Sequence, residues 1–178
     1  MFGGWFNRTK ACAVAQLVDG KTATVRGTVR LGVGRVKAPL SARDTSYYLI
    51  AVEGTEPAFT EGDGLPFFLA DTTGTLVIDP RGAIPVFDPR HADAYREDHT
   101  AARDFEATRR YRRWRSYVSS NLSLFREWCL TDGAELEITG AAFRNVQAAQ
   151  LQQGGFRDSA TQWSMRATPS APLTIRWP

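Results

Sequence analysis

The sequence contains few of the residues that bind metals or act as nucleophiles. Its 178 residues include two cysteines, Cys12 and Cys129, and two histidines, His91 and His99. A structural zinc site needs about four converging Cys or His ligands, and these four are scattered with no CxxC pair. We therefore expect no metal site, no cofactor and no disulfide framework.

Long apolar runs are also missing. No window of about 18 apolar residues is present, so we expect no membrane-spanning helix. The first eight residues, MFGGWFNR, lack the basic region and apolar stretch of a signal peptide. Trp5 and Phe6 in this segment are candidates for contact with a membrane interface, or they pack on the domain. These features predict a cytoplasmic protein, either free or peripheral to the inner face of a membrane.

Sequence patterns of known enzyme classes are absent as well. The chain has no Gly-x-Ser-x-Gly elbow and no Walker A motif. His91 and His99 lie in a polar stretch and are expected to face solvent, while Cys129, between Trp128 and Leu130, is expected in the core. We predict no catalytic residue and no enzyme activity. An enzyme is a further hypothesis beside the binding functions considered below. It requires a cleft in which His91 or His99 lies close to carboxylates.

Positive charge is concentrated in one segment. The chain has only three lysines among its 22 basic residues and a net charge of +3. Residues 103–115 hold six arginines and two acids, which gives +4, so the remaining residues sum to −1. This distribution favours a local contact with an anionic surface over a basic footprint across the whole protein.

Alternating apolar and polar residues predict a mainly β protein. In residues 22–31 one face holds Val25, Gly27 and Val29, and the glycine suggests a bulge or a tight barrel corner. The run Asp71-Thr72-Thr73-Gly74 separates two short apolar runs and predicts a hairpin turn. Further strands are expected in these ranges: 46–53, 66–70, 75–78, 134–142, 161–168 and 173–177. The last two ranges are expected to close the fold as strands within 161–177.

The amino-acid composition changes between Ala92 and Phe125, where glycine and proline are scarce. Ala107, Tyr111, Trp114 and Val118 follow a helical spacing that continues to Phe125. This pattern predicts a helical insertion near residues 92–125. Together with the strands it indicates a mainly β (α+β) fold, an OB-like small β-barrel, formed by residues 1–178 as one domain.

The run RRYRRWR at 109–115 is the most distinctive feature. Three interpretations are open: an interfacial contact with a membrane or acidic partner, binding of single-stranded nucleic acid, or arginines that solvate the outer face of a helix. The candidate binding residues are Arg109, Arg110, Arg112, Arg113, Trp114 and Arg115.

Several sequence pieces occur together in one order. They are APLS at 38–41, paired tyrosines at 47–48, FFLADTTG at 67–74, VIDPRGA at 77–83 and REWCLTDGAELEITG at 126–140. Over about residues 17–142 the chain resembles the GIDE-type domain, also called BAM ("beside a membrane"). That domain occurs in membrane-anchored RING E3 ubiquitin ligases of mitochondria and chloroplasts and in prokaryotic relatives.

The resemblance implies a non-catalytic module that binds proteins or ligands at or near a membrane surface. A RING needs about eight Cys or His ligands and this chain has four, so ligase activity is not expected. The alternative prediction is an OB-like protein that binds single-stranded nucleic acid. The sequence does not name the protein partner or the oligomeric state.

Overall fold

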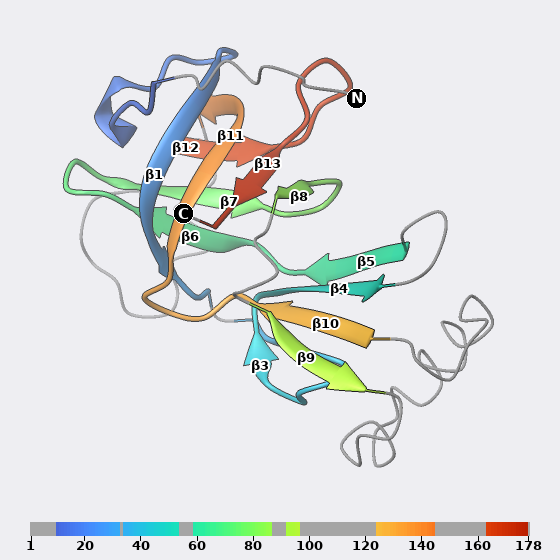
Figure 1. Ribbon diagram of the computed structural model, residues 1–178. Coiled ribbons are helices and arrows are strands. Elements are labelled where there is room, and N and C mark those ends of the chain that lie inside the picture. Colours follow the sequence, from blue (N-terminus) through green and yellow to red (C-terminus); the bar gives the residue numbers. More distant parts are fainter. Residues whose placement is uncertain are drawn as a thin grey trace.

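The computed structural model describes residues 10–32, 34–53, 59–86, 92–96, 124–144 and 163–177. These residues form one short 3-10 helix, η1 (Val14–Gln16), and otherwise strands and turns (Figure 1). The strands are β1 (Thr22–Arg30), β2 (Val36–Lys37), β3 (Asp44–Thr45), β4 (Tyr47–Glu53), β5 (Phe59–Gly64), β6 (Phe67–Ala70), β7 (Thr75–Asp79), β8 (Ile84–Val86), β9 (Asp93–Arg96), β10 (Leu124–Cys129), β11 (Glu135–Arg144), β12 (Trp163–Arg166) and β13 (Thr174–Arg176).

Five strands close into a barrel. They are ordered β1-β6-β7-β12-β11, and β11 pairs with β1 to complete the circle. The β7–β12 pair is parallel and the other pairs are antiparallel. Numbered along the chain, the barrel strands follow the order 1-2-3-5-4, which is the Greek-key order of an OB-type barrel. The predicted mainly β, OB-like barrel is confirmed.

The alternation in β1 arises because successive side chains of a strand point to opposite faces. Val25 and Val29 face the interior and are fully buried. The strand pairs with β11 through Thr28 and with β6 from Thr28 onward. Gly27 lies where β1 passes between these partners, and a Cβ there would come within 2.5 Å of the Ala70 carbonyl oxygen. The predicted corner therefore corresponds to a close approach of two backbones.

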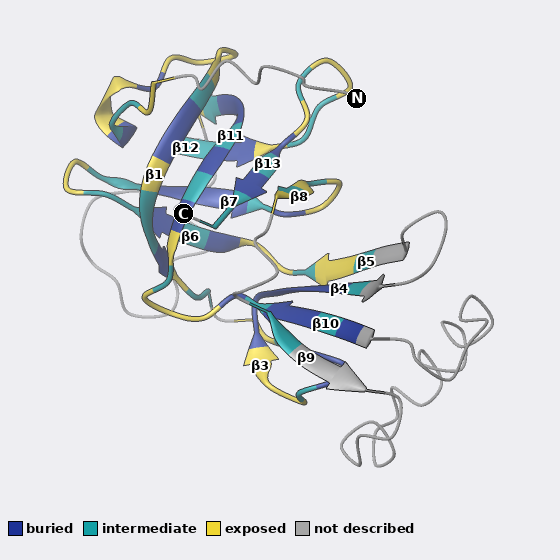
Figure 2. Cartoon of the chain, viewed as in Figure 1, coloured by how far each residue is buried: buried dark blue, intermediate teal, exposed yellow. Residues whose placement is uncertain are grey.

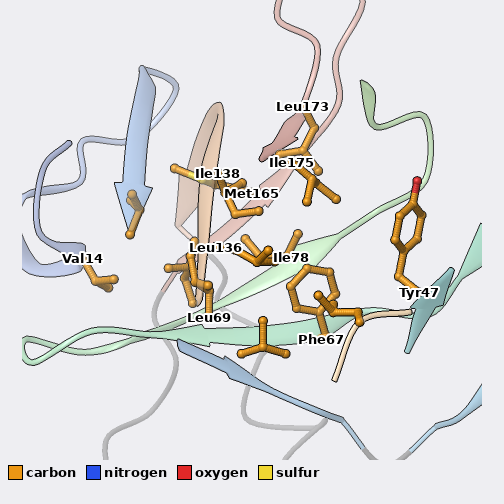
Figure 3. Packing of buried hydrophobic residues seen from close by; sticks show 14 of the residues in the cluster. Val14, Tyr47, Phe67, Leu69, Ile78, Leu136, Ile138, Met165, Leu173 and Ile175 are labelled. Atoms are coloured by element: carbon orange, nitrogen blue, oxygen red, sulfur yellow. The ribbon is translucent and has the colours of Figure 1, made fainter. Parts of the chain in front are cut away.

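The barrel interior holds the larger of two apolar cores (Figures 2 and 3). Every barrel strand contributes at least one fully buried side chain. Among them are Val29, Phe67, Leu69, Leu76, Ile78, Leu136, Ile138 and Met165. Figure 3 shows Phe67 and Ile78 within this cluster and Tyr47 at its edge, with the tyrosine hydroxyl pointing away from the apolar side chains.

Two insertions in the barrel form a separate four-stranded sheet. The first lies between β1 and β6 and supplies β4 and β5, and the second lies between β7 and β11 and supplies β9 and β10. Their order is β5-β4-β10-β9, so the central β4–β10 pair joins the two insertions. One face of this sheet packs on a second apolar core, made of Ala38, Leu40, Tyr48, Ile50 and Phe125.

The predicted helical insertion over residues 92–125 is wrong where the structure describes it. Residues 93–96 form β9, and Leu124 and Phe125 begin β10, which pairs with β9. Residues 97–123 lie outside the described part. The helical spacing that ended at Phe125 was misleading, because β10 pairs with β4, a strand far away in the sequence.

In the described part of the chain, no helix has the length and apolar character needed to cross a membrane.

Candidate functional site

The small four-stranded sheet is an addition to the barrel, and the candidate site is the junction between the two. Alternation in β4 divides neighbouring residues between the two cores. Tyr47 and Leu49 pack in the barrel core, and Tyr48 and Ile50 pack in the second core. The paired tyrosines of the sequence are therefore the point at which one strand serves both units.

Glu127 in β10 joins the 38–41 loop to the small sheet. Its carboxylate is buried, with the residue 1% exposed. Oε1 accepts a hydrogen bond from the Leu40 backbone N–H at 2.7 Å, and Oε2 accepts one from the Ser41 N–H at 2.9 Å. A buried carboxylate needs such donors, because burying a charge without hydrogen-bond partners costs roughly several kcal/mol of folding free energy. Glu127 thus clasps the loop to the sheet.

The loop is shaped to present these two amides. The Ala38 N–H donates to the Arg43 carbonyl and the Ala42 N–H donates to the Ala38 carbonyl, at 2.9 and 3.0 Å. Ala42 adopts a positive φ of 55°, which allows the chain to reverse within a few residues. The turn exposes successive N–H groups toward Glu127, as in an anion-binding backbone concavity.

Cys129 lies beside this clasp. Its Sγ is 3.6 Å from Glu127 Oε2 and 3.6 Å from Ser41 Oγ. Burial and the nearby Glu127 carboxylate raise the pKa of the Cys129 thiol to about 12. Because the thiolate is the reactive form, the thiol is inert at neutral pH and packs as a small core residue.

Further hydrogen bonds fix the junction. Thr45 Oγ1 donates toward the Leu130 carbonyl at 2.7 Å, and the Leu130 N–H donates to the Tyr47 carbonyl at 2.9 Å. Burial, with a smaller contribution from Asp63, raises the pKa of Tyr47 to about 12, so this hydroxyl stays protonated. On the surface, Arg43 pairs with Asp93 at 2.7 Å. The junction is thus a connected polar structure between two apolar cores.

None of the described residues of this junction is a sequence-predicted binding residue. Arg109, Arg110, Arg112, Arg113, Trp114 and Arg115 lie outside the described residues, as do Trp5 and Phe6, and so do His91 and His99. The described strands do fix where the arginine segment leaves the fold. Arg96 at the end of β9 pairs with Leu124 at the start of β10, so the two described residues that flank positions 97–123 lie side by side. Residues 54–58 leave from the same end of the sheet, because Leu124 also pairs with Glu53.

Asp71 forms the predicted hairpin turn between β6 and β7 and also anchors η1. Its Oδ1 accepts hydrogen bonds from the Thr73 and Gly74 N–H groups, and its Oδ2 accepts one from the Val14 N–H at 2.8 Å. Burial raises the pKa of Asp71, but the hydrogen bonds from Thr73, Val14 and Gly74 outweigh it and hold this pKa below its ordinary value. The residue is therefore a structural cap.

Replacing Asp71 with asparagine is expected to destabilise the protein at pH 7 by roughly 1 kcal/mol. The amide NH₂ group of asparagine would take the place of Oδ2, so the Val14 N–H would face a donor instead of an acceptor. A carboxyl group whose pKa is lowered by folding stabilises the protein at pH values above its unfolded-state pKa of about 4. This stabilisation is lost as the pH falls through the pKa of the folded state. Urea unfolding at pH 7 and at about pH 3 should show the gap between the two proteins narrowing at the lower pH. An equal gap at both pH values would contradict the ionised cap.

Among the described residues, no group of three or more His, Cys, Asp or Glu side chains is arranged to hold a metal ion. Comparison with protein-family models, with curated proteins and with solved structures finds no match to this chain.

Glu127 is the functional residue whose role sequence reasoning missed, since it entered only as a member of the piece at 126–140. The available signal is its position: Glu127 alternates with Phe125 and Cys129 on one face of β10, and these two neighbours on that face are apolar. An acidic residue on an apolar face predicts a buried carboxylate with dedicated donors.

Proposed function

We propose that the chain is a non-catalytic binding module of the GIDE/BAM type that works at the inner face of an anionic membrane. One observation carries this proposal: the clasp of Glu127 on the Leu40 and Ser41 amides. It joins two of the sequence pieces on which the resemblance rests, although they lie 87 residues apart. A shared structural reason for these pieces to occur together supports their being one domain type.

The small sheet supplies a way to present the arginine run to a surface. The segment 97–123 leaves and returns at the end of the sheet formed by Glu53, Arg96 and Leu124. Figure 1 shows this end directed away from the barrel. Basic residues near an anionic surface contribute about 1 kcal/mol each, so the five arginines between 109 and 115 are enough for peripheral binding.

Flotation with liposomes tests the proposal. The wild-type chain should float with vesicles that contain phosphatidylglycerol and remain at the bottom with phosphatidylcholine alone. Changing Arg109, Arg110, Arg112, Arg113 and Arg115 to glutamine should reduce the floated fraction by at least about tenfold.

A control with the same loss of charge separates a site from a general effect. It changes five exposed arginines of the barrel and its loops to glutamine: Arg26, Arg30, Arg35, Arg81 and Arg144. This variant should float like the wild type. Equal losses in both variants, or no flotation of the wild type, would refute a membrane contact at the arginine run.

A further inference from the structure

Strand β8 forms one edge of the seven-stranded sheet and carries an exposed apolar pair. Among the described strands its one neighbour is β13, with which it runs parallel. Ile84 is 52% exposed and Val86 is 39% exposed (Figure 2). Of the four large apolar residues that are exposed in the described part of the chain, only these two lie on one strand. A contiguous exposed apolar pair is a candidate contact surface.

The strand registers place this pair beside charged residues on the outer face of the sheet. Ile175 of β13 aligns with Ile138 of β11, and both side chains are fully buried in the barrel core, so this row faces inward. Successive residues of a strand point to opposite faces, so the neighbouring row of Val86, Arg176 and Glu137 faces outward. The apolar pair and Arg176 therefore lie on one surface, about 4.8 Å apart across the two strands.

Arg176 is one of two arginines that share the carboxylate of Glu137. Arg26 donates to Oε2 at 2.9 Å, whereas Arg176 Nη1 lies 3.7 Å from Oε1, beyond hydrogen-bond distance. Two guanidinium groups and one carboxylate leave this row with a net charge of +1. Arg176 is the weakly held partner, so its N–H groups can bind a further carboxylate, for which the planar guanidinium is well shaped.

The backbone of β8 is closed to the addition of a further strand. Ile84 donates its N–H to the Leu173 carbonyl at 2.7 Å, so its backbone groups face β13. The next residue, Pro85, faces the free edge and has no N–H to donate. Proline at this position blocks pairing with a strand from a partner or from a second copy of the chain. A partner must therefore be recognised by the outward side chains.

We infer that Ile84, Val86 and Arg176 form a docking surface for a short acidic and apolar segment of a partner protein. Apolar side chains of such a segment would cover the β8 pair, and a carboxylate next to them would bind Arg176 through two hydrogen bonds. Charge favours this occupant over a lipid surface, because Glu137 lies within the row and leaves it only weakly positive. The inference adds a protein partner to the proposed module and does not depend on its membrane contact.

Selection of random short peptides displayed on phage, against the immobilised full chain, supplies the probe. The selected peptides should carry Asp or Glu beside Leu, Ile, Val or Phe. One of them is then synthesised with a fluorescent label and titrated with the full chain by fluorescence anisotropy. The threonine variant, Ile84→Thr with Val86→Thr, keeps both side chains β-branched and reduces their apolar area. Its affinity for the peptide should fall about tenfold or more, and circular dichroism checks that it folds.

Substitutions of the charged residues should change the affinity for the same peptide in opposite directions. Arg176→Gln should weaken binding about threefold or more. Glu137→Gln should strengthen it, because the carboxylate that competes for Arg176 is removed, and a folding defect would not produce a gain. Two controls should leave the affinity unchanged: Arg30→Gln, whose ion pair with Asp132 also spans 3.7 Å, and Val18→Thr, which changes an apolar residue that is 58% exposed elsewhere.

Any one of the following results would overturn the inference. The selection enriches no peptide, or it enriches basic ones. The threonine variant binds the selected peptide as the wild type does. Light scattering shows a wild-type dimer that the threonine variant loses, which would assign the surface to a second copy of the chain. The threonine variant fails to float with anionic vesicles, which would assign the surface to lipid.

The two proposals can fail separately. The membrane proposal depends on flotation of the wild type and on its loss when the five arginines between 109 and 115 are changed. The docking surface depends on peptide affinity and on the substitutions in β8 and β13. A chain that binds the selected peptide without floating would keep the docking surface and lose the membrane contact.

Discussion

Replacing Glu127 with glutamine is expected to lower the free energy of unfolding by about 2–3 kcal/mol. The buried carboxylate accepts from Leu40 and Ser41 with one oxygen each. A glutamine side chain offers one oxygen and one NH₂ group, so one backbone N–H then faces another donor in a site closed to water. Hydrogen bonds to charged groups and buried unsatisfied donors are both costly, and here they act together.

The matched control is Glu135→Gln at the start of β11, where the side chain is exposed. Urea unfolding of both variants gives the comparison, with the control expected within about 0.5 kcal/mol of the wild type. In E127Q, hydrogen exchange at the Leu40 and Ser41 amides should accelerate beyond the global change, since the loop loses its anchor. Equal stability of the two variants would contradict the role of Glu127 as a clasp.

Gly27→Ala is expected to destabilise the barrel by roughly 2–4 kcal/mol. A Cβ at this position would lie 2.5 Å from the Ala70 carbonyl oxygen and 2.9 Å from its carbon. Both atoms are backbone, so the clash is relieved only when β1 and β6 move apart. That movement would loosen the closed barrel at the point where β1 changes partners.

Gly20→Ala is the comparison that separates crowding from conformation. Gly20 has a φ of +70°, and a Cβ added there would meet no atom within 4 Å, so only the left-handed backbone opposes the alanine. The substitution is expected to cost about 1–2 kcal/mol. Thermal or urea unfolding should show that G27A is less stable than G20A. The reverse order would show that the barrel tolerates a side chain at position 27.

The barrel was predictable from sequence because its signals are local. The alternation around Val25 and Val29 sets the faces of β1, and the Asp71–Gly74 turn sets the β6–β7 hairpin. Both depend on residues within a few positions of each other. The sequence predicted an OB-like barrel from its short strands and turns rather than from any single motif, and it assigned no strand order.

The small sheet was not predictable in the same way. Residues 59–64 have the composition of an acidic, glycine-bearing loop, yet they form β5 against β4. A Cβ at Gly64 would lie 2.4 Å from the Ser46 carbonyl oxygen, and one at Gly62 would lie 2.7 Å from the Tyr47 hydroxyl. These glycines permit a close approach to β4, which only the tertiary partner reveals. β10 likewise depends on β4, so helical periodicity ending at Phe125 misled the prediction.

The candidate site was predicted in part. The sequence pieces around Leu40, Tyr47 and Glu127 were identified, but the contacts between them join residues more than 80 positions apart. Spacing along a chain does not encode such contacts.

The most direct measurement of the central claim is the environment of a dye at each end of the molecule when vesicles are added. The label NBD is attached to a single cysteine at Pro57 or at Thr72, with Cys12 and Cys129 changed to alanine. Residue 57 lies in the sequence between the end of β4 and the start of β5. Exposed Thr72 lies in the β6–β7 turn, on the opposite side of the molecule from that end of β4 (Figure 1). With anionic vesicles the label at 57 should shift to the blue and brighten, and the label at 72 should not change. A response at 72 without one at 57, or none at either position, would contradict a membrane contact through the small sheet.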